Sequence, residues 1–207
     1  MKTFVVALLA LACAGQASAS DPDILTAFDA QSRNLDWYIV NDTVMGGRSN
    51  SRVEQVDNHL VFSGELNTKG GGFASVRSTP TQLDIGDIES FVLKVRGDGR
   101  SYQLRLMSSQ TRLSYATTFN TSDATWLQIE LPLKSFVATW RGRKLNRPPI
   151  NPEDITSIGF MLADNRDGPF SIEVDWIGLE FKKPQAYGSH EIDAAHDDAA
   201  VADRPVR

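Results

Sequence analysis

Two glycine-rich segments of the chain carry residue types suited to holding a ligand. The first runs from Trp37 to Ser49 and contains N-D-T-V-M-G-G. The second runs from Gly70 to Arg77 and reads G-G-G-F-A-S-V-R. Glycine tolerates positive φ and lets another backbone come close, so N–H groups exposed in such loops can surround an anion. Neither segment contains a phosphate-binding loop of the G-x-x-x-x-G-K-[ST] or G-x-G-x-x-G kind. The alternative is that both segments are turns between strands.

A third candidate combines an aromatic ring with positive charge. Trp140 is followed by Arg141 and, two residues on, by Arg143. A flat indole ring can stack on a sugar, and a guanidinium can hold a partner's carboxylate. Arg105 and Tyr115 would line the same face if their strands are neighbours. The alternative is a tryptophan packed on its own strand with the arginines in water.

Nucleophilic and redox chemistry have few residues to use. The single cysteine, Cys13, lies in the N-terminal leader described below, and the three histidines are His59, His190 and His196. His59 follows the turn signal Asp57-Asn58, so we expect it at the tip of a hairpin and not as a general base. A Ser-His-Asp arrangement would have to form around His59 alone.

Four carboxylates gather towards the C-terminal end of the predicted domain, at Asp164, Asp167, Glu173 and Asp175. Oxygen-rich clusters bind calcium, and two carboxylates across a cleft can act as acid and base on a sugar. Linear spacing does not place such a pair, and solvated turn charges are the favoured interpretation. The sequence therefore predicts no catalytic residue, no metal and no cofactor. A carboxylate glycosidase is the one enzymatic alternative.

The charge of the chain bears on its class of partner, and its N-terminal leader bears on its location. The 207 residues carry a net charge of −5 and a pI near 5.2, so the basic footprint of a nucleic-acid-binding protein is absent. Lys2, the apolar run Phe4–Ala14 and the A-x-A site Ala17-Ser18-Ala19 predict a secretory signal over residues 1–19. This leader predicts an exported protein, periplasmic or secreted, with acylation at Cys13 as the alternative. A transmembrane helix would need about 20 consecutive apolar residues, and we predict none.

The end of the chain has a different composition. Residues 184–207 contain several Asp and Glu, many alanines and almost no large apolar residues. Such a segment cannot bury enough surface to fold, so a disordered acidic tail is predicted. His190 and His196 lie in it, where a solvated tail is favoured over a weak metal site.

Between leader and tail, apolar residues recur with a period of two. Phe91, Leu93 and Val95 form one alternating set, and Tyr102, Leu104 and Leu106 another, which is typical of half-buried antiparallel strands. The predicted strands are Trp37–Val40, Arg52–Val56, Leu60–Leu66, Phe73–Arg77, Phe91–Arg96, Tyr102–Met107, Leu113–Phe119, Leu127–Pro132, Ile155–Leu162 and Phe170–Phe181. Many short strands without helical periodicity favour one all-β domain over residues 20–183, a β-sandwich or a barrel.

Local signals refine this prediction at four places. Gly97-Asp98-Gly99 predicts a tight hairpin between its flanking strands. A change of parity predicts a β-bulge near Trp176-Ile177. Single helical turns are expected around Asp23–Ala27 and Pro152–Ile155. The main stretches without strands are expected at Asp21–Leu35 and Arg141–Asn151.

The motifs also resemble a known family. Trp37 followed by N-D-T-V-M-G-G-R-S from Asn41 to Ser49 resembles the hallmark of the complex I intermediate-associated protein 30 family. Further similar stretches follow in order at Gly70–Arg77, Trp126–Pro132, Phe136–Gly142, Ile158–Leu162, Gly168–Phe170 and Asp175–Ile177. The resemblance covers about Ile24 to Phe181, and it implies an antiparallel β-sandwich jelly roll of the galactose-binding-like type.

The resemblance also carries expectations about function. The eukaryotic member of this family is an assembly chaperone for mitochondrial NADH:ubiquinone oxidoreductase and not an enzyme, whereas this chain carries a secretory signal. Sandwiches of this type often hold a structural calcium, to which Asp29 or Asp175 would contribute. The favoured expectation is that this protein binds no metal. We therefore expect a non-enzymatic binding or assembly module of the cell envelope whose partner is another envelope protein, with carbohydrate binding as the alternative.

The candidate binding residues combine the glycine segments with the tryptophan segment. They are Asn41, Asp42, Met45, Gly46, Gly47, Gly71, Gly72, Phe73, Arg77, Trp140 and Arg141.

Overall fold

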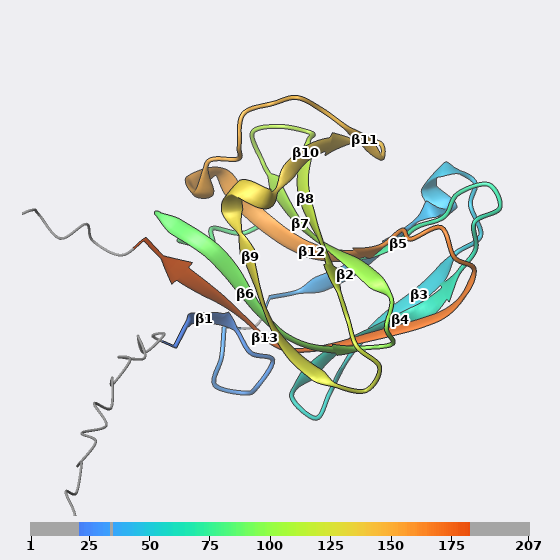
Figure 1. The fold of residues 1–207 in the computed structure, drawn as a ribbon, viewed down its shortest axis with the longest axis horizontal. Coiled ribbons are helices and arrows are strands. Elements are labelled where there is room, and N and C mark those ends of the chain that lie inside the picture. The colour runs from blue at the N-terminus through green and yellow to red at the C-terminus, as the bar shows by residue number, and fades with distance from the viewer. Residues whose placement is uncertain (1–20, 34, 183–207) are drawn as a thin grey trace, which may run out of the picture.

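A computed structural model describes residues 21–33 and 35–182. The predicted leader (1–19) and the predicted tail (184–207) lie outside the described residues. Within the described ranges the chain forms two antiparallel sheets that pack face to face, as Figure 1 shows. The predicted all-β antiparallel sandwich is thereby confirmed. None of the helices in these ranges is long and apolar enough to cross a membrane.

Sheet A has β13 at its centre. Its order is β3-β4-β13-β6-β9, and β1 also pairs with β13. The strands are β1 (Asp23–Thr26), β3 (Asn50–Val56), β4 (His59–Leu66), β6 (Ile88–Gly97), β9 (Trp126–Pro132) and β13 (Gly168–Phe181).

Sheet B carries the candidate site. Its order is β11-β10-β8-β7-β12-β5-β2. The strands are β2 (Trp37–Asn41), β5 (Ala74–Ser78), β7 (Ser101–Ser108), β8 (Ser114–Asn120), β10 (Val137–Trp140), β11 (Arg143–Lys144) and β12 (Ile155–Leu162).

The core lies between the two sheets and follows the period of two. On β7, Tyr102, Leu104 and Leu106 are fully buried, and Gln103 and Arg105 point to the opposite face. Fully buried side chains of both sheets meet in one cluster that includes Phe62, Phe91, Leu93, Val76 and Phe160. Since successive side chains of a strand point to opposite faces, this packing fixes which residues sheet B presents to solvent.

Short 3-10 turns interrupt the strands at three places, η1 (Asp42–Met45), η2 (Leu133–Ser135) and η3 (Pro152–Asp154). The predicted turn at Pro152 is confirmed, with Asn151 before it, although the Asn151 side chain makes no capping hydrogen bond. The predicted bulge is also present, because the register between β13 and β6 shifts between Val174 and Trp176.

Two local predictions were wrong. Residues Asp23–Thr26 form strand β1 where a helical turn was expected, because Leu25 and Thr26 are buried and the segment pairs with β13. Arg143–Lys144 form β11 inside a stretch expected to lack strands, through pairing of Trp140 with Arg143. Both strands are too short for alternation to reveal them.

The predicted hairpin at Gly97–Gly99 was wrong in a more informative way. Strand β6 pairs with β13 and β9 in sheet A, and β7 pairs with β12 and β8 in sheet B, so this turn crosses between the sheets. A Cβ on Gly97 would lie 2.5 Å from the Thr121 hydroxyl, which shows how closely the corner is packed. Alternation shows only that one face of each strand is buried. It is the same whether two consecutive strands form a hairpin in one sheet or lie in two sheets that face each other.

Candidate functional site

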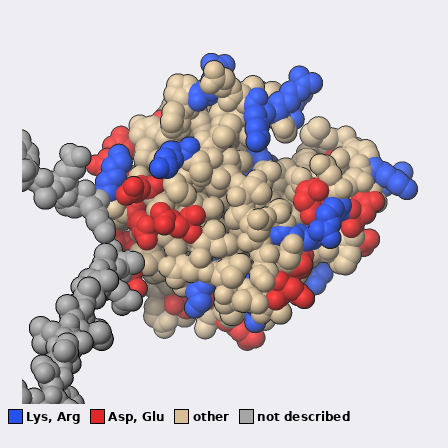
Figure 2. Space-filling view, in the orientation of Figure 1, with Lys and Arg blue, Asp and Glu red and all other residues tan. Residues whose placement is uncertain are grey.

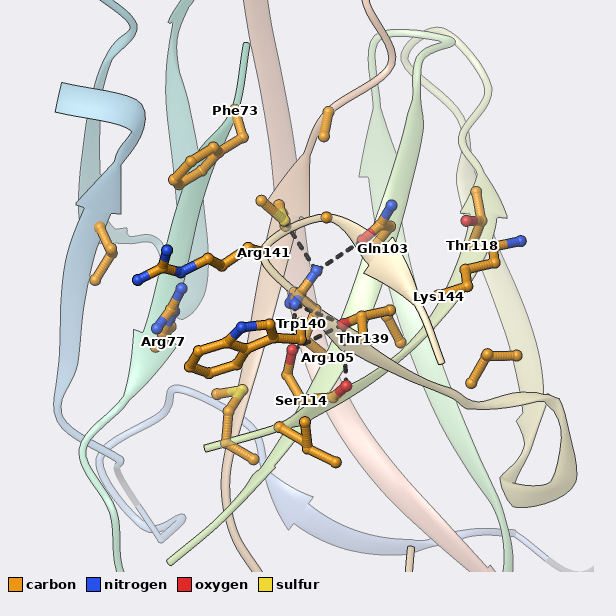
Figure 3. Close-up of a pocket in the computed structure, with 18 of the residues that line it drawn as sticks. Phe73, Arg77, Gln103, Arg105, Ser114, Thr118, Thr139, Trp140, Arg141 and Lys144 are labelled. Atoms are coloured by element: carbon orange, nitrogen blue, oxygen red, sulfur yellow. Dashed lines mark hydrogen bonds between the residues drawn. The ribbon is translucent and has the colours of Figure 1, made fainter. Parts of the chain in front are cut away.

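A cleft of about 930 Å³ lies on the face of sheet B that points away from the core. Side chains of β5, β7, β8, β10 and β12 form its floor, and two loops, one at η1 and one joining β10 to β11, form part of its rim. Figure 3 shows the cleft with Arg105 at its centre.

Arg105 is held in place by neutral groups. Its Nη1 donates to Gln103 Oε1 (3.1 Å) and lies 3.1 Å from the Met161 sulfur, and its Nη2 donates to Thr139 Oγ1 (3.0 Å) and to the Ser114 hydroxyl. Its Nε is buried and has no hydrogen-bond partner among the residues that the structure describes. The guanidinium is therefore fixed in position, but none of these contacts neutralises its charge.

The strand register of sheet B places Arg77 close to Arg105. In the register of sheet B, Gly159 of β12 pairs with Arg77 of β5 on one side and with Arg105 of β7 on the other. Residues paired in register share a face of the sheet, and the glycine between them has no side chain to separate the arginines. The buried Nε of Arg77 also has no hydrogen-bond partner. Burial, and secondly the charge of Arg77, lower the pKa of Arg105 to about 10.

The cleft has a positive lining in an acidic protein. Its charged residues are Arg77, Arg105, Arg112, Arg141 and Lys144, and none of the described Asp or Glu residues lines it. Among the described residues no carboxylate forms an ion pair with any of the five. In Figure 2 basic side chains stand at the upper edge of the molecule, where Figure 1 places β10 and β11, and acidic ones lie below them.

The two glycine segments of the sequence meet at Asp42. This residue is fully buried, and its carboxylate accepts hydrogen bonds from the backbone N–H of Gly72 (2.6 Å) and from the N–H and hydroxyl of Ser49 (2.9 and 2.7 Å). The N–H of Phe73 contributes a longer one of 3.4 Å. The glycine-segment N–H groups thus surround an anion, and that anion is a side chain of the protein itself.

Close packing explains the glycines around this carboxylate. A Cβ on Gly47 would lie 2.2 Å from Asp42 Cγ, and one on Gly71 would lie 2.3 Å from Asp42 Oδ2. Burial by itself would raise the pKa of Asp42, but the hydrogen bonds from Gly72 and Ser49 outweigh it and hold the pKa below 3.8. Asp42 is therefore an ionised structural anchor that fixes the η1 loop at the rim.

The structure divides the candidate binding residues into two groups. Those that line the cleft are Met45, Gly71, Gly72, Phe73, Arg77, Trp140 and Arg141. Those that do not line it are Asn41, Asp42, Gly46 and Gly47. The second group shapes the loop, since Asn41 accepts a hydrogen bond from the Ser51 hydroxyl (2.7 Å) and Gly46 adopts a φ of +88°.

Trp140 is the last residue of β10, lines the cleft and is 38% exposed. The guanidinium carbon of Arg141 lies 5.5 Å from the centre of its ring, within the range of a cation–π contact. The expected partner Tyr115 is on β8, next to β7, but it is buried in the core, because it pairs with the inward-facing Leu106. Arg105 faces the cleft as expected, and Tyr115 does not.

The carboxylates considered for catalysis are engaged elsewhere. Asp164 accepts two hydrogen bonds from Arg100 (2.9 and 2.6 Å), and Asp175 pairs with Lys94 (2.8 Å) and lies 3.6 Å from His59. None of these carboxylates lines the cleft. In the described part of the chain no group of three His, Cys, Asp or Glu side chains could hold a metal ion. His59 begins β4, and its ring packs 5.0 Å from that of Trp126.

Sequence reasoning did not single out the rest of the floor. Gln103, Ser114 and Thr139 hold Arg105, and Met107 and Met161 lie beside them in the lining. The outward parity of Gln103 and Met107 was visible in the alternation along β7, whereas β10, which carries Thr139, was not among the predicted strands. That this outward face forms a cleft depends on the order of strands in sheet B.

The fold is an antiparallel β-sandwich with a cleft on the outer face of sheet B. The chain belongs to the complex I intermediate-associated protein 30 family, whose model matches residues 26–174. It is 27% identical to the mitochondrial complex I intermediate-associated protein 30 of Drosophila melanogaster (78% of this chain, 64% of the relative). It is 39% identical to a probable counterpart from Caenorhabditis briggsae (73% and 52%). The chain thus spans about half to two thirds of the length of these relatives.

Solved structures of carbohydrate-binding modules share the fold. A family 11 module of a cellulosomal cellulase of Clostridium thermocellum has a TM-score of 0.57 at 16% identity, covering 82% of this chain and 100% of the module. A family 11 module from the same organism, in complex with a β-1,3-1,4-mixed-linked tetrasaccharide, has a TM-score of 0.54 at 19% identity (79% and 98%). At these identities the likeness concerns the fold.

Proposed function

We propose that this protein is a non-enzymatic, assembly-factor-like module of the cell envelope that binds another protein in the cleft of sheet B. The observation that carries the proposal is the convergence of two sequence regions on one cleft. Met45 and Phe73 adjoin β2 and β5 towards one edge of sheet B, Trp140 belongs to β10 towards the other edge, and all three line the cleft. Membership of the complex I intermediate-associated protein 30 family supports an assembly role, and the predicted leader supports export.

The rim supplies apolar surface for a protein contact. Val44 is 69% exposed and Met45 65% exposed, yet the loop that carries them is fixed by the buried Asp42. Large apolar side chains held rigidly in solvent are typical of interaction sites, because they lose little conformational freedom on binding. Methionine adapts its shape to different partners. The rim of the cleft is therefore suited to a protein surface or segment.

Carbohydrate binding is the second candidate, and it is favoured by a specific observation. The fold is that of family 11 modules, one of which was solved with a tetrasaccharide, and this cleft combines an exposed tryptophan with Gln103, Thr117 and Thr118. Hydroxyl and amide groups beside an aromatic ring can hold a sugar. Arg141 already lies over the Trp140 ring and would have to move for a sugar to stack on that face.

A paired experiment separates the two candidates. Wild type, Met45→Asp and Trp140→Ala are used to capture proteins from envelope extract, with identification by mass spectrometry, and are applied in parallel to a glycan array. Val56→Asp serves as the matched control, because Val56 is also an exposed apolar residue (47%) but belongs to β3 of sheet A. We expect one partner to be lost with Met45→Asp and retained with Val56→Asp. Glycan binding that depends on Trp140, with no partner lost by Met45→Asp, would overturn the protein-binding proposal.

A further inference from the structure

The cleft carries positive charge that nothing in the described chain balances. Arg77 and Arg105 lie across Gly159 on its floor, and neither is paired with a carboxylate in the described ranges. Each has a buried Nε without a hydrogen-bond partner. Two like charges taken partly out of water are unfavourable for the free protein, and a bound anion would relieve that cost.

Part of the uncharged lining is apolar and adaptable. All three methionines of the described residues, Met45, Met107 and Met161, line the cleft, together with Phe73, Leu113 and Val137. Protein–protein interfaces are enriched in arginine, methionine and aromatic residues and depleted of Asp, Glu, Lys, Ser and Ala. The lining follows that composition in its arginines, its methionines and its two aromatic residues, Phe73 and Trp140, and departs from it in Lys144 and in its serines and alanines.

We infer that the cleft binds an extended peptide segment of the partner protein in which one or more Asp or Glu residues are flanked by large apolar residues. The carboxylate is received by Arg77 and Arg105 at the floor, and the apolar neighbours lie against Met45, Phe73 and Val137. This inference rests on the proposed function, since it names the part of the partner that the cleft recognises.

The arrangement favours a peptide over an acidic saccharide. A polyuronate presents a charge on every sugar unit and no large apolar group, so it would leave the methionine surface without a partner. A peptide supplies both kinds of group, and carboxylate–arginine pairing provides the orientation that apolar contact lacks. Arg105 is preorganised for this role because Gln103, Ser114 and Thr139 hold it before the ligand arrives.

The test begins with a library of displayed random peptides selected on the immobilised full-length protein. We expect the selected peptides to be enriched in Asp or Glu next to Leu, Ile, Phe or Val. The affinity of a selected peptide is then measured by calorimetry for wild type, Arg77→Gln and Arg105→Gln at low and high salt. Each variant is expected to bind roughly tenfold more weakly, because one charge-assisted contact is lost, and the wild-type affinity is expected to fall with salt.

Controls keep the result interpretable. Arg77→Gln removes no hydrogen bond that the described structure shows, so its fold is expected to be intact, and Arg105→Lys retains the charge and is expected to recover part of the affinity. Arg52→Gln changes an exposed arginine of β3 that pairs only with Glu54, and it is expected to bind like wild type. Melting temperatures of all variants confirm that loss of binding is not loss of fold.

The outcomes distinguish this inference from the proposed function. Selected peptides without acidic residues, or unchanged affinity in both arginine variants, would overturn the inference. If oligogalacturonate binds through Arg77 and Arg105 and no peptide is selected, the ligand is an acidic saccharide and the inference fails. If Met45→Asp loses the envelope partner while the arginine variants keep it, the proposed function stands and only the inference falls. If none of these variants loses a ligand, both fail.

Discussion

The Oδ2 atom of Asp42 lies 2.6 Å from the backbone nitrogen of Gly72, 30 positions further along the chain. This hydrogen bond joins the two glycine segments into one unit at the rim of the cleft. The motif that identifies the family therefore has a structural role at Asp42, Gly47 and Gly71. The neighbouring Val44, Met45 and Phe73 line the cleft.

Replacement of the anchor carboxylate tests this role. We expect Asp42→Asn to lower the free energy of unfolding by about 3 kcal/mol, because an amide NH2 would face the N–H groups that now donate to a carboxylate. Urea denaturation measures the effect. Asp57→Asn, at an exposed turn position with positive φ that asparagine tolerates, is the matched control and should be neutral. Equal stability of Asp42→Asn and wild type would show that the carboxylate is not an anchor.

The glycines beside Asp42 give a steric test. Gly47→Ala and Gly71→Ala each place a Cβ within 2.3 Å of an Asp42 side-chain atom, so each is expected to cost about 2 kcal/mol. Gly86→Ala is the control, since nothing lies within 4 Å of its Cβ position. Thermal melting of the three variants measures the difference. A Gly86→Ala variant as unstable as the other two would argue against the clash as the cause.

The buried Arg100 and the half-buried Arg105 are expected to respond differently to loss of charge. Arg100 and Asp164 form a bidentate pair whose side chains are only 6% and 10% exposed, so Arg100→Met leaves an unpaired buried carboxylate and should cost about 3 kcal/mol. Arg105→Met removes a desolvated charge that has no carboxylate, and Ser114 and Thr139 still bond each other (3.0 Å). Its stability is expected within about 1 kcal/mol of wild type. Chemical denaturation measures the free energy of unfolding of both variants. A larger loss of stability in Arg105→Met than in Arg100→Met would contradict this account.

Stability should fall in acid for a defined reason. Burial alone would raise the pKa of Asp164 as it would that of Asp42, but hydrogen bonds and the Arg100 charge hold the Asp164 pKa below 3.8. A carboxyl group whose pKa is lowered in the folded state stabilises that state above pH 3.8. This contribution is lost as the pH falls through the lowered pKa. Unfolding free energies measured across the acid range should therefore decrease, and Asp42→Asn should reduce that slope. An unchanged slope would assign the acid sensitivity to other groups.

The sequence by itself determined most of the strands, their buried faces and the resemblance to the family. A period of two is a property of the extended backbone, so Tyr102, Leu104 and Leu106 had to face the core and Gln103 and Arg105 the other side. The N-D-T-V-M-G-G segment was recognisable from the order of its residue types. These features consist of residue types and their spacing along the chain, so they can be recognised in the sequence.

Only the tertiary structure decided which strands are neighbours, and the site follows from that. Alternation cannot tell a hairpin from a turn that crosses between sheets, so the corner at Gly97 was predicted in the wrong topology. The placement of Arg77 beside Arg105 requires β12 to lie between β5 and β7 with a glycine at the point of contact. The anion bound by the glycine segments also emerged only in space, because its carboxylate and its donors lie far apart in sequence. Long-range strand pairing is set by the packing of the whole core, and no local pattern contains it.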